Sequence, residues 1–201
     1  MIYKLNKKGE TLIEVITALT SLVLAGVAAV TVIISMMQSN AISKEYLIAQ
    51  NLAREGIEGV ITIRNTNWLR FPSTKSTDWL CVNVDNDNSC DQTIYQGNYI
   101  LDRNVNNLGE GFTLARVELD LDLSNGLDSQ FQLTKKQGGD VELYSHWTDS
   151  TDQSPVFYRM ITFEQIGTTN DKYKVTAKIQ WKNGSKINEY KLSSIITNYA
   201  K

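Results

Sequence analysis

The sequence predicts an α+β fold, in which one long N-terminal helix packs on a C-terminal antiparallel β-sheet. Three observations predict it. No charged residue occurs from Val15 to Met37, and no proline interrupts residues 38–67, where apolar residues recur at helical spacing. From about residue 113 the pattern changes to the apolar–polar alternation of strands, and an Asn-Gly step marks a hairpin. A helix followed by a run of strands is the pattern of an α+β domain.

The apolar stretch Val15–Met37 is long enough to cross a membrane. As a helix it would extend about 35 Å, and the hydrocarbon core of a bilayer is about 30 Å thick. Its polar members are only Thr and Ser, whose hydroxyls can donate to carbonyls of their own helix. Three lysines, Lys4, Lys7 and Lys8, precede Gly9 without any acidic residue. This bias predicts a cytoplasmic N-terminus and an external C-terminal part. An uncleaved signal anchor is the alternative interpretation of the stretch.

One acidic residue, Glu14, stands at the entrance of this stretch. A charge at the centre of a membrane-spanning helix costs roughly 2.5–3.5 kcal/mol on insertion scales, and less near the edge. Charges in such positions usually have a partner. Glu14 is therefore a candidate functional residue.

Residues 38–67 are expected to continue the helix as an amphipathic half beneath the head domain. The apolar residues form one stripe, and most charged residues lie outside it. Gly56 and Gly59 are expected to be weak points, each costing about 1 kcal/mol relative to Ala. The predicted apolar stripe consists of Leu47, Ile48, Leu52, Ile57, Val60 and Ile61.

The head is predicted to be rich in strands and to end in a meander. The region 69–107 is polar with little periodicity, which indicates loops with short strands. A two-residue hairpin is expected at Lys182-Asn183-Gly184-Ser185. The predicted strands are Thr113–Leu123, Pro155–Ile166, Tyr173–Trp181 and the return strand Ile187–Tyr199.

Two cysteines, Cys81 and Cys90, enclose eight residues. If the head lies outside the cytoplasm, a disulfide between them is expected, because disulfides persist there. A loop this short would stabilise the head by roughly 2–3 kcal/mol. Two free thiols are the alternative. A zinc site is disfavoured, because no second Cys pair exists and His146 is the only histidine.

Two groups of oxygen-bearing side chains are weak calcium candidates. Asp85, Asp87 and Ser89 have the spacing of the first ligands in a calcium loop, but Cys90 replaces the expected glycine. A solvated polar loop explains them better than a calcium site does. The second group falls on the polar face of the predicted strand 113–123, so a solvent-facing edge explains it; it comprises Asp120, Asp122 and Ser124.

No constellation predicts catalysis. No Ser or Cys nucleophile signature accompanies His146, and no phosphate-binding glycine motif is present. We therefore expect a non-enzymatic protein without a cofactor. Among the tryptophans, Trp181 belongs to a strand pattern and is expected in the core. Trp79 and Trp147 are expected to be exposed, which leaves an adhesive or DNA-contacting role of the head as an alternative.

The segment Lys7–Val15, KKG-ETLIEV, resembles the leader and cleavage site of type IV pilins and type II secretion pseudopilins. The resemblance implies that a membrane peptidase cuts after Gly9 and that the new N-terminal residue, Glu10, is methylated. Glu14 then occupies the fifth mature position, where the family carries an acidic residue. The chain departs from the family at Glu10, where Phe is usual.

The resemblance also implies a mechanism of assembly. The carboxylate of Glu14 would pair with the N-terminal amine of a neighbouring subunit, which removes two unpaired charges from an apolar setting. The expected role is a structural subunit of a type IV pilus-like filament. The segment Ala49–Trp68 is similar to minor pilins and minor pseudopilins, so a minor subunit is favoured over the alternative of a major pilin. A membrane-anchored binding module that never polymerises is the rival from another class.

The implied partners are other pilin subunits, the prepilin peptidase, the assembly platform with its ATPase, and the membrane. The prepilin would first sit in the cytoplasmic membrane and the mature subunit in an external or periplasmic filament. The expected organisation is a basic leader, a membrane and filament-core half of the helix, an amphipathic half and a β-rich head, at residues 1–9, 10–37, 38–67 and 68–201.

Overall fold

The computed structural model describes residues 7–84, 89–103, 111–124, 129–138, 141–146 and 157–199. The chain divides into two compact units, residues 1–46 and 47–201. Helix α1, Lys7–Arg70, supplies the first unit and the beginning of the second. It ends two residues before Pro72, whose ring disfavours helical backbone in the residue that precedes it. The predicted long helix is confirmed, and it extends three residues beyond the expected end at Asn67.

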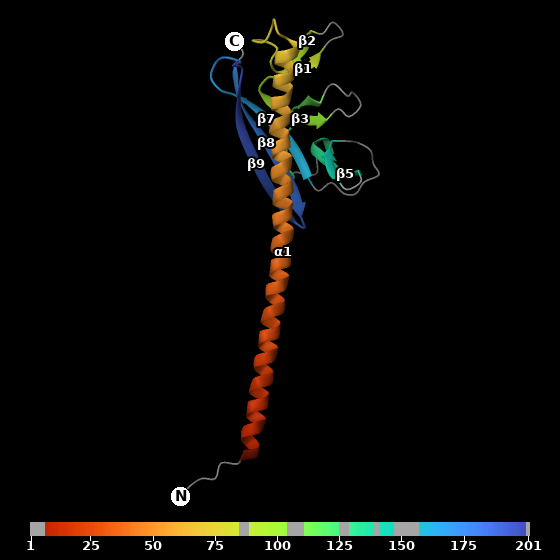
Figure 1. Cartoon of the computed structure of the whole chain (residues 1–201). Coiled ribbons are helices and arrows are strands. Elements are labelled where there is room, and N and C mark those ends of the chain that lie inside the picture. Colours follow the sequence, from red (N-terminus) through yellow and green to blue (C-terminus); the bar gives the residue numbers. More distant parts are fainter. Residues whose placement is uncertain are drawn as a thin grey trace. The chain divides into compact units, whose positions relative to one another are not determined.

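The strands of the second unit form two antiparallel sheets, shown in green to blue in Figure 1. The smaller sheet pairs β1 with β2. In the larger sheet, one edge of β7 pairs with β3, which continues to β4, and with β5, which continues to β6. The opposite edge of β7 pairs with β8, and β8 pairs with β9. The bounds are β1 Cys81–Val84, β2 Cys90–Thr93, β3 Gly97–Arg103, β4 Phe112–Val117, β5 Gln132–Gly138, β6 Val141–Ser145, β7 Phe157–Gln165, β8 Lys172–Asn183 and β9 Lys186–Thr197, with a short 3₁₀ helix at Ser129–Phe131.

The predicted C-terminal meander is confirmed. Strands β7, β8 and β9 pair in sequence along their full lengths. Asn183 pairs with Lys186, so Gly184 and Ser185 form the two-residue turn. Gly184 has φ of 60°, the left-handed conformation that such a turn requires and that glycine adopts without strain.

Strand β7 is the centre of the large sheet. Its whole length pairs with β8 on one edge. The other edge is shared, because β5 pairs near Phe157 and Tyr158 while β3 pairs with residues 161–163. Arg159 lies where these two neighbours part. Its guanidinium donates to the carbonyl oxygens of Leu52 and Leu101 and forms an ion pair with Glu55 at 3.2 Å. The side chain therefore links α1 to the sheet at the point where the sheet divides.

The helix approaches the sheet through small residues. A Cβ atom placed on Gly56 would lie 2.8 Å from Ile161 Cδ1 and 3.3 Å from Ala177 Cβ, and one on Gly59 would lie 2.6 Å from Leu101 Cδ2. Figure 1 shows the yellow part of α1 running over the strands. Besides the expected helix-propensity cost, these glycines therefore have a packing role: their missing side chains permit the close approach.

The buried stripe of α1 also differs from the predicted one. Leu52, Ile57 and Val60 are buried as expected. Leu47, however, is 60% exposed, and Ile48 and Ile61 lie at the half-buried margins. The centre of the stripe is occupied instead by small residues that hydropathy alone does not single out. The buried positions of the helix in the head are Ala49, Leu52, Ala53, Gly56, Ile57, Gly59, Val60, Ile63 and Asn67.

A second, smaller core lies on the face of the sheet opposite α1. The predicted strand Thr113–Leu123 stops at Val117, the end of β4, and the following chain is irregular. Leu121 and Leu123 are buried there against Tyr158 and Met160 of β7. Leu119 points into solvent. The apolar–polar alternation of this segment therefore reflects packing under the sheet rather than one continuous strand.

The end of β9 is attached to the end of α1. Trp68 Nε1 donates to Asn198 Oδ1 at 3.2 Å, and Asn198 Nδ2 donates to the carbonyl oxygen of Lys75 at 2.9 Å. The rings of Trp68 and Tyr199 meet edge to face at 4.3 Å. The Arg64 guanidinium lies over both rings, at 4.6 and 5.3 Å from their centroids. These contacts form a clasp between the first and last described elements of the head.

The close approach at Gly56 generates a prediction. Gly56→Leu should lower the stability of the head by about 1–3 kcal/mol, because the added carbons would enter the space of Ile161 and Ala177. Gly26→Leu is the matched control, since no atom lies within 4 Å of a Cβ at that position. Thermal unfolding of the full chain in detergent, followed by far-UV circular dichroism, measures both. Equal transition midpoints for the two variants would show that Gly56 does not make this contact.

Candidate functional site

The first unit presents apolar side chains on all sides of helix α1. Leu22, Val23 and Leu24 are consecutive, yet they are 71%, 60% and 70% exposed. Because successive residues point about 100° apart around a helix, this exposure covers its whole circumference rather than one face. The helix is long and apolar enough to cross a membrane. It is thus compatible with a single-pass membrane anchor.

The polar groups of this apolar segment are satisfied by the helix itself. The hydroxyls of Thr17, Thr20 and Ser21 donate to backbone carbonyls three or four residues earlier, at 2.7–3.0 Å. Thr31 and Ser35 do the same at 2.8 and 2.9 Å. This confirms the expected back-bonding. No hydroxyl of these five residues needs water or a neighbouring chain as its acceptor.

Glu14 is the only charged residue between positions 11 and 37. Its side chain is exposed, and it makes no hydrogen bond or ion pair with any residue that the structure describes. Among the described residues, the carboxylate therefore has no partner within the apolar segment 11–37. In water this costs nothing, but in an apolar environment it requires a cation or a proton.

The remaining residues of the N-terminal motif are only partly described. The backbone of Lys7, Lys8, Gly9 and Glu10 is helical, so the bond after Gly9 lies inside α1. Their side chains lie outside the described part, as does Lys4 altogether. The structure therefore fixes the backbone around the expected cleavage site but not the placement of the basic groups.

The predicted disulfide is present. Cys81 and Cys90 are bonded, with their Cα atoms 5.8 Å apart, and they join β1 to β2. Between them, Asp85 and Asp87 lie outside the described residues, while Ser89 is exposed. Within the described ranges there is no group of three or more His, Cys, Asp or Glu side chains that could hold a metal ion.

The second weak calcium candidate has other partners. Asp120 pairs with Lys178 Nζ at 3.2 Å. Asp122 accepts hydrogen bonds from the backbone amide and the hydroxyl of Ser124, and these bonds lower the pKa of its carboxyl. Asp120, Asp122 and Ser124 were predicted to lie on the polar face of a strand. They lie instead in the irregular segment that follows β4.

The burial of the tryptophans differs in part from the prediction. Trp181 is fully buried, as predicted. Trp79 is only 2% exposed, so the prediction that it is exposed is wrong. Its ring packs near Tyr173, and its indole N–H donates to the carbonyl oxygen of Asn170 at 3.2 Å, which satisfies the buried polar atom. Trp147 lies outside the described residues.

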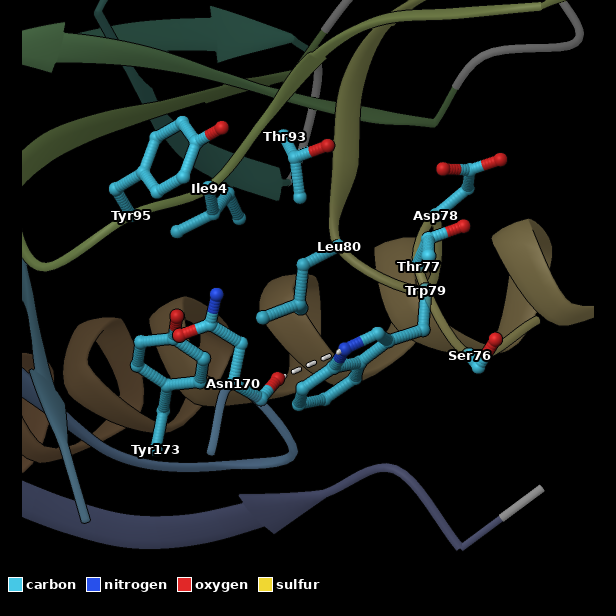
Figure 2. Close-up of a pocket in the computed structure, with 10 residues that line it drawn as sticks. All are labelled: Ser76, Thr77, Asp78, Trp79, Leu80, Thr93, Ile94, Tyr95, Asn170 and Tyr173. Carbon is cyan, nitrogen blue, oxygen red and sulfur yellow. Dashed lines mark hydrogen bonds between the residues drawn. The ribbon is translucent and has the colours of Figure 1, made fainter. Parts of the chain in front are cut away.

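A pocket of about 260 Å³ opens beside Trp79. Three segments that are distant in sequence line it, residues 76–80, 93–95 and part of the turn and strand at 170–173. Figure 2 shows Thr93, Ile94 and Tyr95 on one side, Trp79, Asn170 and Tyr173 on the other, and Leu80 between them. Sequence reasoning missed this pocket, because no local motif contains residues from all three segments.

His146 is largely enclosed within the head. Its two ring nitrogens make no hydrogen bond of ordinary geometry with a described residue, although the backbone of Gln130 and Gln132 lies near the ring. Burial, and then the positive charge of Arg159, lower the pKa of His146 to about 3, although the backbone of Gln130 and Gln132 acts in the opposite direction. This low pKa indicates a side chain that folding keeps unprotonated.

The low pKa of His146 predicts acid sensitivity. Below about pH 6.5 the unfolded chain binds a proton that the folded chain does not bind until about pH 3. Stability should therefore fall as the pH decreases through this interval, by up to about 1.4 kcal/mol per pH unit. Urea unfolding of the wild type and of His146→Gln between pH 7 and pH 5, above the usual range of carboxyl groups, measures the difference. Parallel pH profiles would contradict the prediction.

Comparison with known proteins adds no relative: no family model matches the chain, and no curated protein or solved structure matches it significantly.

Proposed function

We propose that this protein is a structural, non-enzymatic subunit of a type IV pilus-like filament, processed after Gly9 and assembled through its N-terminal helix. The observation that carries the proposal is an apolar helix, exposed on every side, with one unpaired carboxylate at Glu14. This helix directly follows the Lys7–Glu10 motif. The following paragraphs give the physical support for each step.

The apolar surface of the helix is suited to two successive environments, the lipid bilayer and a bundle of similar helices. Because the described Thr and Ser hydroxyls bond back to their own helix, the surface requires no polar partner. It is suited to lipid before assembly and to packing against other such helices afterwards. A lipid-only anchor would need no carboxylate in this stretch, so Glu14 favours assembly over simple anchoring.

Glu14 supports a specific contact between subunits. A charged group in an apolar setting is stable only with a partner of opposite charge. Cleavage after Gly9 would create a new amine at Glu10, one helical turn from Glu14 in the same chain. The amine of one subunit and the Glu14 carboxylate of its neighbour would then neutralise each other and set the axial stagger between the two helices.

The helical backbone at Gly9 bears on processing. A peptidase must draw the scissile bond out of α1 into an extended form, since proteases bind extended substrates more readily than helices. Glycine lowers the cost of leaving the helix by about 1 kcal/mol relative to Ala. Gly9 thus eases local unwinding at the place where the bond is to be cut.

Within this function we favour a minor subunit, on the resemblance of Ala49–Trp68 to minor pilins and pseudopilins. A major pilin is the alternative within the class. A membrane-anchored binding module that does not polymerise is the alternative from another class, and the pocket beside Trp79 is the observation that would suit it. The two experiments below separate these outcomes.

The N-terminus of the mature chain tests processing. Mass spectrometry of the protein from cells with an active prepilin peptidase should find a chain that begins at Glu10 and carries one N-methyl group. Protein from cells with an inactive peptidase, the control, should retain Lys7, Lys8 and Gly9. A chain that begins at Met1 in both, or one cut within the head, would exclude the processing step.

The charge of Glu14 tests assembly. Glu14→Gln should still be processed and reach the membrane, but its amount in sheared surface filaments should fall at least about tenfold, because the neighbouring amine loses its partner. Glu58→Gln, an exposed residue of the same helix within the head, is the matched control and should assemble normally. Equal incorporation of both variants would refute the charge-pairing role. Absence of the wild-type chain from filaments would favour the anchored binding module, and its abundance there would distinguish a major from a minor subunit.

A further inference from the structure

The pocket beside Trp79 has the composition of a small-ligand site. It is lined by aromatic rings, by the apolar side chains of Leu80 and Ile94, and by several hydroxyl, amide and carboxylate groups. Its volume of about 260 Å³ is slightly below the range of about 300–1,000 Å³ that is typical for drug-sized ligands. A ligand of one six-membered ring with its substituents is therefore the appropriate size.

Tyr173 shows that the pocket contains an unused polar group. The residue is 2% exposed, and its ring packs at 6.1 Å from Trp79 and 6.3 Å from Phe163. Its hydroxyl makes no hydrogen bond with any residue that the structure describes. In Figure 2 the hydroxyl lies at the end of the ring that faces Ile94 and Tyr95. The hydroxyl oxygen is not among the described side-chain atoms that are enclosed without a partner, so it opens onto the pocket, where a ligand hydroxyl can take the place of water.

The ionisation of Tyr173 suits it for donating. Burial, followed by the nearby Tyr99 and Tyr95, raises the pKa of its phenol above the ordinary value. The group therefore remains protonated at neutral pH and can both donate and accept a hydrogen bond. Tyr99 itself is not available, because its hydroxyl bonds to the backbone amide and carbonyl of Tyr95, each at 3.0 Å.

Asp78 supplies an acceptor at the rim. Its carboxylate makes no hydrogen bond or ion pair with any described residue, although its backbone is fixed by bonds to Thr74 and Cys81. None of the ten described residues that line the pocket is basic. An anionic ligand would therefore meet a carboxylate without a compensating cation, which disfavours it.

The lining distinguishes among the remaining ligand classes. An ammonium group can use the carboxylate, the aromatic faces and the hydroxyl oxygens of Ser76 and Thr93, but it offers no acceptor to the amide N–H groups of Asn170. A sugar hydroxyl both donates and accepts, so it matches a mixed set of amide, hydroxyl and carboxylate groups. The apolar edges of Leu80 and Ile94 suit the C–H faces of a sugar ring.

We infer that the pocket binds a neutral monosaccharide unit, with Tyr173 and Asp78 as its polar anchors and Trp79 and Leu80 as its apolar wall. The walls are held firmly. The disulfide joins Cys81 and Cys90 next to Leu80 and Thr93, and the bond from Trp79 Nε1 to Asn170 holds the turn before β8 in place. A preformed pocket loses little entropy on binding. This inference concerns the head alone and does not depend on filament assembly.

The test uses the full chain in a polyoxyethylene detergent, because glycosidic detergents would compete for the pocket. Saturation-transfer NMR is recorded with four probes, the methyl glycosides of glucose, galactose, mannose and N-acetylglucosamine. At least one should bind with a dissociation constant of about 1 mM or tighter. Choline chloride serves as the cationic probe and should not bind. If no glycoside binds, or if choline binds in their place, the inference is wrong.

Variants then locate the binding. Tyr173→Phe keeps the ring and removes only the hydroxyl, and Asp78→Asn keeps the shape and removes the charge. Each should weaken binding about three- to tenfold. Tyr190→Phe is the matched control, because it removes a phenolic hydroxyl from β9 outside the pocket. Unchanged melting curves verify that the variants fold. Binding that is unaffected by both pocket variants would place the sugar elsewhere and overturn the assignment.

Discussion

The head of this protein depends on how closely helix α1 can approach the sheet. At Gly56 and Gly59 the helix meets Ile161, Ala177 and Leu101 at distances that leave no room for a side chain. Close approach lets the larger residues on either side of this row reach the sheet together, so that a single helix covers the central strands. It also brings the carbonyl of Leu52 and the carboxylate of Glu55 within reach of Arg159, whose buried charge would otherwise be unpaired.

Local patterns in the sequence predicted the local elements well. The long helix, the meander β7-β8-β9 with its turn at Gly184, the burial of Trp181 and the disulfide all follow from features within one segment or between near neighbours. Non-local features were not predicted. The division of one edge of β7 between β5 and β3, the packing of Leu121 under the sheet and the burial of Trp79 each depend on distant partners, which neither periodicity nor turn chemistry encodes.

The two candidate sites also differ in whether the sequence alone can reveal them. The proposed assembly segment can be recognised from sequence, because the lysine-rich start, the apolar run and Glu14 are consecutive. The pocket cannot, because residues 76–80, 93–95 and 170–173 come together only through the pairing of β1 with β2 and the position of the turn before β8. If the two proposals hold, the helix would carry assembly and the head would carry recognition, in two different parts of the chain.

The clasp at Trp68, Asn198 and Tyr199 has a consequence for how the head opens. Chain ends and terminal strands usually fray first, at little cost in free energy. Here the last turns of α1 and the residues that follow β9, Asn198 and Tyr199, contact each other, so neither end can detach without breaking contacts of the other. The earliest and latest elements of the head are thereby coupled into one cooperative unit. A protease that attacks frayed ends would gain access only when that unit opens as a whole.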